Sequence, residues 1–422
     1  MRVPAVLRKL RQQLHSAPEL SGSEAQTAKT IRGFLDKHAP PHQLVSNLGG
    51  HGIAAVYGTA GTIVFAQTTS SNFTALSAGP TVLIRGDIDA LPIEEATNVN
   101  YQSQSSGVMH ACGHDGHSTM VTGLAMHLAE NPPQGFKVVC LFQPAEETGK
   151  GARAVIRDPQ YEQLRPDAAF ALHNYPGDPM GAVRVRSGCM MMASCGTEIV
   201  WEGRTSHAAQ PWAASPAAGA LLHALQHLPN GPASSEDLSF VGDSGAMTTV
   251  THASLGEPAF GITPGTAKIL TTSRASSDAL LDAELQRVVG VAQQAAKAAK
   301  EAAGEASGGF SMSIQEHDAF ASTHNDKLAA RLITKAALAR SLDVMQQEYP
   351  ILWSEDFGVI LRDMRRNNPN AWGGAMFTLG SGEEQPPLHD PEYDFPDGLL
   401  ELGVPLWCDI VQKAGQALLE RA

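Results

Sequence analysis

The stretch FKVVCLFQP (Phe136–Pro144) is apolar at most positions, and it decides the fold class of this 422-residue chain. A strand that is buried on both faces of a sheet has no solvent face, so its sequence is continuously apolar and does not alternate. Two further runs, PTVLIRGD (Pro80–Asp87) and DAAFALHN (Asp167–Asn174), have the same character, and helical segments such as STMVTGLAMHLAE (Ser118–Glu130) separate them. This pattern predicts an α/β sheet.

The segments on either side extend this pattern. Apolar residues recur at helical spacing near the N-terminus and again near the C-terminus, and further short apolar runs predict strands. A segment of small polar residues, Thr68–Gly79, is expected to be a surface loop without a function. The helices are expected at residues 3–17, 21–39, 326–342 and 398–419, and the strands at residues 52–58, 61–67 and 375–382.

The order of predicted strands and helices changes from about Ser194, which predicts a second domain. The order of elements becomes strand, helix, two strands, the long helix Asp278–Glu305 and a final strand, which is the β-α-β-β-α-β pattern of a compact α+β unit. After this unit the α/β texture resumes, so the smaller domain is inserted into the larger one. We therefore predict a catalytic domain of residues 1–193 and 316–422, and an inserted domain of residues 194–315.

Composition excludes several classes of partner. The chain carries 43 acidic and 30 basic side chains, and no lysine- and arginine-rich run that could follow a phosphate backbone, so nucleic acid and anionic membranes are not expected partners. The opening residues lack the apolar core of a signal peptide, and no segment approaches the about 20 apolar residues of a membrane span. Five scattered cysteines without a C-x-x-C pair argue against a disulfide framework. We expect a cytoplasmic protein.

The stretch MHACGHDGHSTM (Met109–Met120) gathers one cysteine and three histidines. Cys112 and His114 are two residues apart, so on an extended segment their side chains reach the same point, and thiolate and imidazole both bind zinc-like ions. Asp115 and Ser118 are candidate caps of the following helix. In the alternative interpretation these histidines are only cap and surface residues.

Other strand ends supply further ligand types. The pair Glu146–Glu147 follows one buried strand, and adjacent carboxylates point apart, so one can bind a metal while its neighbour faces water. His173 ends a second strand, and Asp87 and Asp89 follow a third. With His389 in a proline-rich turn before the last helix, these segments deliver Cys, His, Glu and Asp side chains to one sheet edge. The sequence therefore predicts a metal site.

Taken together, the motifs resemble those of the M20 metallopeptidase family, in order and in spacing over nearly the whole chain. The most similar branch contains hippurate hydrolases, N-acyl-amino-acid amidohydrolases and auxin-conjugate hydrolases. The resemblance implies a large zinc-peptidase-like α/β catalytic domain with an inserted lid that commonly mediates dimerisation. It rests on RQQLHSAPELSGSE (Arg11–Glu24), RGDIDALPI (Arg85–Ile93), MHACGHDGH (Met109–His117), FQPAEETGKGA (Phe142–Ala152), ALHNYPG (Ala171–Gly177) and LHDPEYDF (Leu388–Phe395).

The resemblance also implies roles for individual residues. Glu146 looks like the general base and acid, and Asp87 and Asp89 resemble carboxylates that orient metal ligands. GRTSHAAQPW (Gly203–Trp212) resembles the G-x-x-x-H-A-A-x-P element of the lid, so His207 is a candidate to stabilise the tetrahedral oxyanion, either within the subunit or across a dimer interface. The alternative is a plain loop histidine. Arg274 on a lid strand is a candidate partner for a substrate carboxylate. A pair of divalent ions would be held by Cys112, His114, Glu147, His173 and His389.

Three features depart from the family pattern. The lid has FGITPG (Phe260–Gly265) where relatives often carry N-V-I-P-D, so an asparagine suspected of contacting substrate is absent. Asp390 occupies a position where a small polar residue is more common, and Thr68–Gly79 is extra. None of these departures removes a proposed ligand or the base, so the expected chemistry is unchanged. The change in the lid leaves the identity of the substrate open.

The predicted function is a metal-dependent amidohydrolase that cleaves the amide bond of N-acyl amino acids or similar conjugates. Its two divalent ions are expected to be zinc or manganese, with cobalt or nickel as further options. One alternative is an exopeptidase acting on di- or tripeptides, and another is a non-catalytic homologue that binds metal or amino-acid conjugates. A redox role for Cys112 lacks a second cysteine nearby in sequence. The expected partners are a small-molecule substrate and a second copy of the chain.

Overall fold

The computed structural model describes residues 4–58, 79–231, 245–304, 309–369 and 371–421. The chain divides into two compact units. Unit 1 comprises Met1–Met190, Thr323–Glu348 and Asp356–Ala422, and unit 2 comprises Met191–Ser322 and Tyr349–Glu355. The strand expected at residues 61–67, and the loop expected at 68–79 apart from Gly79, lie outside the described residues.

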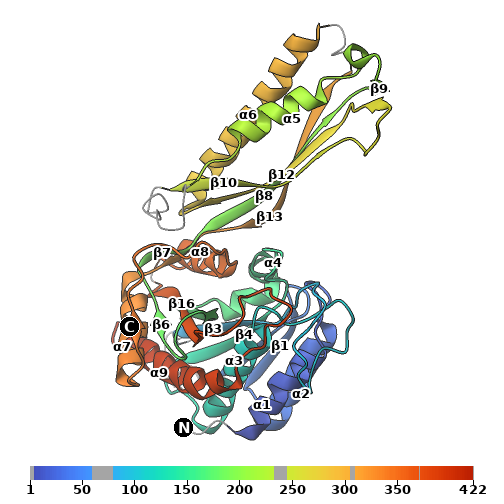
Figure 1. The fold of residues 1–422 in the computed structure, drawn as a ribbon. Coiled ribbons are helices and arrows are strands. Elements are labelled where there is room, and N and C mark those ends of the chain that lie inside the picture. Colours follow the sequence, from blue (N-terminus) through green and yellow to red (C-terminus); the bar gives the residue numbers. More distant parts are fainter. Residues whose placement is uncertain (1–3, 59–78, 232–244, 305–308, 370, 422) are drawn as a thin grey trace. The chain divides into compact units, whose positions relative to one another are not determined.

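Unit 1 is built on an eight-stranded mixed sheet (Figure 1) in the order β1-β2-β4-β3-β5-β16-β6-β15. Its four central strands, β4, β3, β5 and β16, run parallel, while β2 pairs antiparallel with β4 and β6 pairs antiparallel with β16. Together with the separate sheet of unit 2, this confirms the predicted α/β fold with a smaller α+β unit. The strands are β1 (Gln43–Leu48), β2 (Gly52–Tyr57), β3 (Thr81–Asp87), β4 (Lys137–Gln143), β5 (Ala168–Pro176), β6 (Val183–Arg184), β15 (Val344–Met345) and β16 (Gly373–Gly382).

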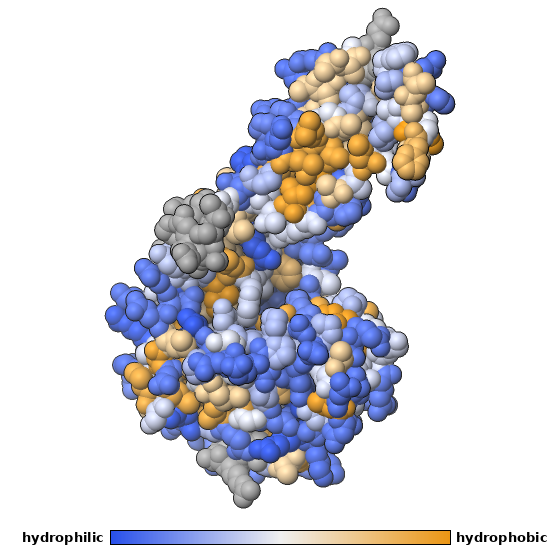
Figure 2. All heavy atoms as spheres, viewed as in Figure 1, coloured by the Kyte–Doolittle hydropathy of each residue, from blue (hydrophilic) through white to orange (hydrophobic). Residues whose placement is uncertain are grey.

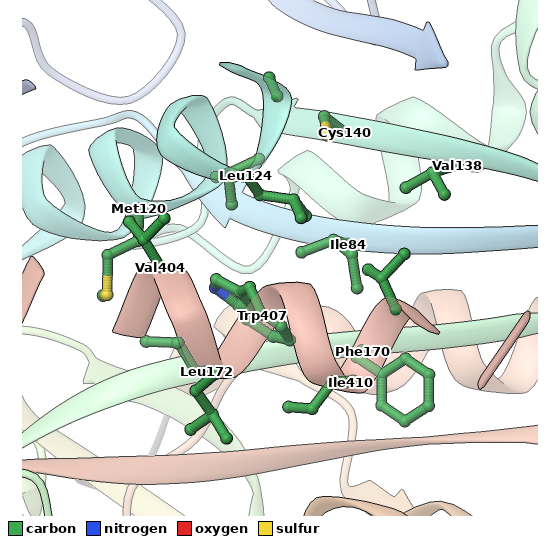
Figure 3. Close-up of a cluster of buried hydrophobic side chains, with 14 of the residues drawn as sticks. Ile84, Met120, Leu124, Val138, Cys140, Phe170, Leu172, Val404, Trp407 and Ile410 are labelled. Atoms are coloured by element: carbon green, nitrogen blue, oxygen red, sulfur yellow. The ribbon is translucent and has the colours of Figure 1, made fainter. Parts of the chain in front are cut away.

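Successive side chains of a strand point to opposite faces of the sheet, so both faces of the unit 1 sheet carry side chains that helices can cover. On β3, Val82 and Ile84 join the large core cluster, in which Trp407 and Leu124 also lie (Figure 3). The buried Arg85, one residue after Ile84, contacts Asp356 at the start of α8 instead. The helices of the large cluster are α1 (Ala5–Ser16), α2 (Ala25–His38), α3 (His114–Glu130), α7 (Lys327–Ala339) and α9 (Leu400–Leu419), while α4 (Gly151–Arg157) packs with α8 (Phe357–Asn367).

Unit 2 has a four-stranded antiparallel sheet in the order β10-β12-β8-β13. Two helices cover one face of this sheet (Figure 1) and share its core of buried apolar side chains, among them Trp201, Ile269 and Val288. Along the chain the order is strand, helix, two strands, helix and strand, as the sequence predicts. The elements are β8 (Ala193–Glu202), α5 (Ala217–His227), β10 (Ala246–Leu255), β12 (Ala267–Ala275), α6 (Asp278–Ala303) and β13 (Ser311–Phe320).

The sequence of the long helix α6 explains why this segment is helical. The hydroxyl of Ser277 accepts a hydrogen bond from the backbone N–H of Leu280 and so caps the first turn. Its buried residues recur at helical spacing and form one apolar stripe against the sheet. They include Leu281, Val288, Ala292, Ala295 and Ala299.

The remaining elements are short. Two small sheets pair β9 (Ser206–His207) with β11 (Ile262–Thr263) and β7 (Gly188–Met191) with β14 (Thr323–Asn325), and there are 3-10 helices at Pro159–Leu164, Pro211–Ala213 and Asp397–Leu399. Over the described ranges, no helix combines the length and the apolar character needed to span a bilayer.

Candidate metal centre

The parallel strands of unit 1 bring the predicted site residues to one edge of the sheet. Asp87 ends β3 and lies in register with Gln143, which ends β4. Asp89 and the pair Glu146–Glu147 follow these two strands, and His173 lies near the end of the adjoining strand β5. Because parallel strands end at the same edge, residues far apart in sequence meet there.

The start of α3 adds Cys112 and His114 to this edge. Gly113 between them has φ +89°, in the left-handed region that favours glycine, and a Cβ there would lie 2.3 Å from the Oδ1 of Asn174. The N-cap position of α3 is Gly113, which makes no side-chain cap, but the Oδ1 of Asp115 accepts the N–H of Gly116 in the first turn at 3.0 Å. The Oδ2 of Asp115 lies 2.8 Å from the Nδ1 of His15, and Ser118 is no cap, because its hydroxyl donates to the carbonyl of His114.

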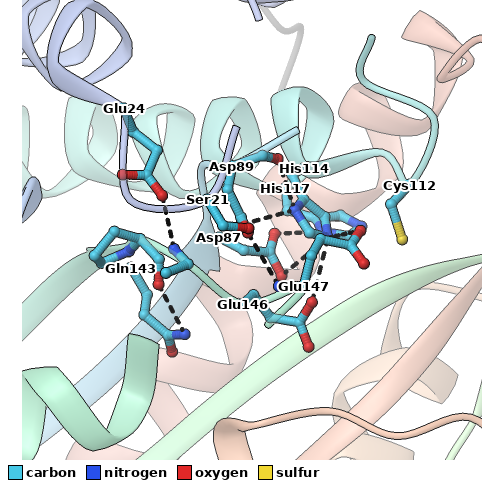
Figure 4. Close-up of polar contacts among 12 residues, drawn as sticks. Ser21, Glu24, Asp87, Asp89, Cys112, His114, His117, Gln143, Glu146 and Glu147 are labelled. Atoms are coloured by element: carbon cyan, nitrogen blue, oxygen red, sulfur yellow. Dashed lines mark hydrogen bonds and ion pairs between the residues drawn. The ribbon is translucent and has the colours of Figure 1, made fainter. Parts of the chain in front are cut away.

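The five proposed metal ligands lie in two overlapping groups that share Cys112, and Figure 4 labels Cys112, His114 and Glu147. The Nε2 atoms of His114 and His389 each lie 3.7 Å from the Oε1 of Glu147. The Sγ of Cys112 lies 3.4 Å from the Nε2 of His173. Two sets of ligand atoms lie within 4.8 Å of one another, namely Cys112, His114 and His173, and Cys112, Glu147 and His389.

This cluster fits divalent cations. The Nε2 of His114 and the Oε1 of Glu147 are buried and make no hydrogen bond, although buried polar atoms are nearly always paired. Thiolate, imidazole and carboxylate are the ligand types of zinc and of several other transition metals. A bound cation would explain why the Nε2 of His114 and the Oε1 of Glu147 are buried without hydrogen-bond partners.

Two aspartates contact histidines at this edge of the sheet. The Nδ1 of His114 lies 2.9 Å from the backbone carbonyl of Asp89, which leaves Nε2 facing the cluster. The Oδ1 of Asp89 is 3.2 Å from the same nitrogen. Asp87 bonds the Nδ1 of His117 at 2.7 Å and pairs with the buried guanidinium of Arg85. Carboxylates in such positions fix the tautomer and the ring orientation of a ligand.

His117 is a site residue to which the sequence analysis gave no role. Its Nε2 lies 2.6 Å from the Oδ1 of Asn174, whose amide nitrogen donates to the hydroxyl of Tyr393. This chain of contacts ties α3 to β5 and to the turn that follows His389. The pattern of His114 and His117, three apart at the start of a helix, places both on one face and was the available indication.

The electrostatics of the cluster indicate a surplus of negative charge. Burial raises the pKa of the Cys112 thiol, and the nearby carboxylates raise it further. Burial also raises the pKa of Glu147 to about 7, against the opposing effect of His114. For His114, burial alone would lower the pKa, but Asp87 and Asp89 outweigh it and raise the pKa to about 10. A cation would stabilise the ionised thiol and carboxylate together.

Glu146 lies beside the cluster. Its side chain is buried, and its Oε2 is 3.9 Å from the Nε2 of His114. His389 approaches from another segment with its backbone in the left-handed region at φ 67°, and its N–H donates to the carbonyl of Ala111. Non-glycine residues in this region are uncommon and often lie at functional sites.

The two predicted site residues of unit 2 are described within that unit. His207 is exposed on β9, opposite Ile262 of β11, and its Nδ1 accepts the N–H of Ala209 at 3.1 Å. The Nη1 of Arg274 donates to the carbonyl of Leu352 and to the hydroxyl of Ser354. Within the segment FGITPG, β11 spans Ile262–Thr263.

Comparison with known proteins identifies relatives of this fold and site. The model of peptidase family M20/M25/M40 matches residues 83–413. An N-acetyl-L-cysteine deacetylase of Bacillus subtilis is 39% identical over 203 residues, which cover 48% of this chain and 44% of that protein. A hippurate hydrolase of Campylobacter jejuni is 33% identical over 223 residues, covering 52% and 53%. The chain spans about half the length of the curated relatives it matches.

A solved structure is similar over nearly the full length. It is a dinuclear metal-binding peptidase of the M20 family from Bacillus subtilis, with a TM-score of 0.70 and 24% sequence identity, and the match covers 98% of each chain. At this identity the likeness shows the fold, including the large α/β unit and the smaller unit with its own sheet.

Proposed function

The chain belongs to peptidase family M20/M25/M40, whose model matches residues 83–413, and from this membership we propose that it is a metal-dependent amidohydrolase. Its substrates are the amides of N-acyl amino acids or of similar amino-acid conjugates. The names of the similar proteins, an N-acetyl-L-cysteine deacetylase and a hippurate hydrolase, support this substrate class. Both names describe an acyl group joined to an amino acid through an amide bond.

One observation carries the proposal: the buried carboxylate of Glu146 lies beside the side chains that we propose as metal ligands. Two divalent ions would be held by Cys112, His114, Glu147, His173 and His389. When bound, such ions would polarise the amide carbonyl and lower the pKa of a water molecule. Glu146 is 3.9 Å from the ligand atom of His114, so it is close enough to serve that water.

Glu146 has two tasks in this mechanism. It takes a proton from the attacking water and passes the proton to the departing amide nitrogen, which is a poor leaving group until it is protonated. A carboxylate can do both only if its environment allows both protonation states, and a buried position favours the neutral form more than water does. The side chain of Glu146 is 7% exposed.

Two residues of unit 2 complete the proposal. His207 would donate to the developing oxyanion, and a single donor of this kind is typically worth about 3 kcal/mol. Its ring is exposed and its Nδ1 accepts a backbone N–H, which leaves Nε2 as the donor. Arg274 would pair with the carboxylate of the amino-acid part, since the two hydrogen bonds it makes through Nη1 go to uncharged acceptors, Leu352 and Ser354.

The metal is proposed to be zinc or manganese, with cobalt or nickel able to replace it. The thiolate of Cys112 favours zinc because both are soft, whereas carboxylate ligation suits manganese as well. Availability in the cell then decides which ion is present. None of the five cysteines forms a disulfide, which supports a reducing compartment such as the cytoplasm.

We also propose that unit 2 mediates a homodimer. Helix α5 carries Leu222 and Leu225, which are 60% and 38% exposed, and apolar side chains gather over this helix in Figure 2. Clustered apolar side chains on a surface commonly mark an interface between proteins. Light scattering of the purified protein tests this, and a monomer at micromolar concentration would contradict it.

The decisive experiment is hydrolysis of a panel of N-acyl amino acids and dipeptides by metal-stripped protein resupplied with zinc, manganese or cobalt. We expect amine release from N-acyl amino acids, and hydrolysis of dipeptides alone would favour an exopeptidase. Glu146→Gln should bind metal normally and lose turnover by at least about 100-fold. No release with any metal would support a non-catalytic binding protein, and equal turnover in Glu146→Gln would refute the role of this residue.

A further inference from the structure

The residue before the proposed base has an unusual backbone conformation. Ala145 has φ 51°, in the left-handed region that residues with a Cβ seldom adopt. This conformation costs about 1–2 kcal/mol for an L-residue, so the surrounding structure must hold it. Because Ala145 directly precedes Glu146, its φ and ψ angles decide the direction in which the carboxylate of Glu146 leaves the chain.

Two buried carboxylates accept the backbone N–H groups of the residues on either side of Glu146 (Figure 4). The Oε1 of Glu24 accepts the N–H of Ala145 at 2.9 Å, and the Oδ2 of Asp89 accepts the N–H of Glu147 at 3.0 Å. The carbonyl of Ala145 is fixed as well, since it accepts the N–H of Gly151 at 3.0 Å. The backbone that carries Glu146 is therefore anchored before and after this residue.

Burying the carboxylate of Glu24 costs free energy, and a purely structural role would not require such a side chain. Its side chain is 0% exposed, and its Oε2 is buried without a hydrogen-bond partner. Burial raises the pKa of this carboxyl group, which means that the site disfavours its charged form. The residue stands directly before α2, yet its side chain makes no helix cap; Glu19 fills that role by accepting the N–H of Thr27 at 2.7 Å.

We propose that Glu24 is a positioning residue for the proposed reaction: by holding Ala145 in the left-handed conformation, it directs the carboxylate of Glu146 toward the metal cluster. Its other hydrogen bond, from the N–H of Gly22 at 2.7 Å, fixes its own loop. The N-terminal loop, on this account, is part of the active-site support. The inference rests on the proposed function of Glu146.

Three variants test the role of the carboxylate. Glu24→Ala removes the acceptor, and we expect kcat to fall about 10- to 100-fold with KM changed less than about threefold, because a small misplacement of a catalytic group has effects of this size. Glu24→Gln keeps an oxygen that accepts both N–H groups and should retain kcat within about threefold. Glu19→Ala is the matched control, since it removes a cap of α2 without touching Ala145. It should lower the free energy of unfolding and change kcat little.

A double-mutant cycle tests the link to Ala145. Glycine adopts the left-handed conformation without strain, so Ala145→Gly should make Glu24 less necessary. We expect Glu24→Ala to lower kcat less in the Ala145→Gly background than in the wild type. Equal losses in both backgrounds, or a loss in Glu24→Ala no larger than in Glu19→Ala, would overturn the proposal.

Hydrogen exchange separates this inference from the proposed function. In the wild type the amides of Ala145 and Glu147 are bonded to buried carboxylates, and the segment 144–151 should exchange slowly. Glu24→Ala should speed exchange in this segment by at least about tenfold, while Glu24→Gln and Glu19→Ala should not. This result is readable even if no amide is hydrolysed, and unchanged exchange in Glu24→Ala would refute the role of Glu24.

Discussion

The Sγ of Cys112 lies 3.4 Å from the Nε2 of His173, although the two residues are 61 positions apart in the chain. The two side chains differ in whether they must lose a proton before they can bind a metal. Burial lowers the pKa of His173, as does the charge of its histidine neighbours, so its imidazole is neutral. The pKa of the Cys112 thiol is raised, so this ligand still carries its proton at neutral pH.

Metal binding should therefore release the proton of Cys112. At pH 8, Glu147, with a pKa of about 7, is mostly ionised, whereas His114, with a pKa of about 10, must also lose a proton in every variant. We expect Cys112→Ala to release about one proton fewer per subunit than the wild type. Calorimetric titration with zinc in buffers of different ionisation enthalpy measures this number.

The control for this titration is Cys408→Ala, which changes a half-buried thiol outside the cluster and should release as many protons as the wild type. Metal affinity of the wild type should rise with pH, because protons compete with the metal for the ligands. Equal proton release by Cys112→Ala and the wild type would exclude the thiol as a ligand that ionises on binding.

The pH dependence of stability should report His15. Burial alone would lower its pKa, but hydrogen bonds to Asp115 and Glu95 outweigh it and raise the pKa to about 9. Because an unfolded histidine has a pKa near 6.5, the stabilisation is complete below about pH 6.5 and is lost as the pH rises through about 9. The loss is on the order of 3 kcal/mol.

Urea unfolding of the metal-loaded protein at pH 6 and pH 9.5 measures this loss. In His15→Gln the side chain no longer titrates, so the decrease in the free energy of unfolding between these two pH values should shrink by the contribution of His15. A variant that loses as much stability as the wild type over this range would contradict the raised pKa.

The strand-end residues were predictable because short-range patterns determine where they lie. A continuously apolar run predicts a buried strand, and parallel strands end at one edge, so Asp87, Glu147 and His173 could be assigned to one site before the fold was known. In the same way, the order of elements after Ser194 predicted the separate α+β unit.

The supporting contacts could not be predicted in this way. His15 and Asp115 are 100 positions apart, and Glu24 and Ala145 are 121 apart, and no periodicity links them. Asp115 was expected to cap α3 because its position allows it, and its Oδ1 accepts the N–H of Gly116 in the first turn. The contact of its Oδ2 with the buried imidazole of His15 is a tertiary contact, so the local pattern of the sequence could not show it.

Replacing glycine by alanine should have opposite effects on stability at the tightly packed start of α3 and on the exposed side of α2. A Cβ at Gly116 in α3 would lie 2.3 Å from the ring of Phe395, which is fully buried and cannot move away. At Gly33 in α2, which is exposed, a Cβ would meet nothing within 4 Å. We expect Gly116→Ala to destabilise the protein by about 1–3 kcal/mol or more, and Gly33→Ala to stabilise it by about 0.5–1 kcal/mol.

Chemical denaturation of the two variants provides the measurement, and each serves as the control for the other because both replace a helical glycine by alanine. Destabilisation by both variants to the same extent would mean that the loss of a helical glycine itself, and no clash with Phe395, determines the result.

Arg11 should contribute far more to stability than its neighbour Arg8 on the same helix. The guanidinium of Arg11 is fully buried and donates to Asp394 and Asp397, both at 2.8 Å. Replacing it by methionine leaves these carboxylates without their cation, and breaking a buried pair in this way typically costs about 3–5 kcal/mol. Arg8→Met removes only a half-exposed pair with Glu401 and should cost less than about 1 kcal/mol.

The same substitution should weaken metal binding, because Asp394 and Asp397 lie on the segment that also carries His389. Arg11→Met releases this segment from α1, and the ligand atom of His389, now 3.7 Å from Glu147, loses part of its support. Urea unfolding and zinc titration of Arg11→Met and Arg8→Met measure the two effects. If both variants lost the same stability, Arg11 would be no more than a surface charge in energetic terms; if Arg11→Met bound zinc as tightly as Arg8→Met, the position of His389 would not depend on this clamp.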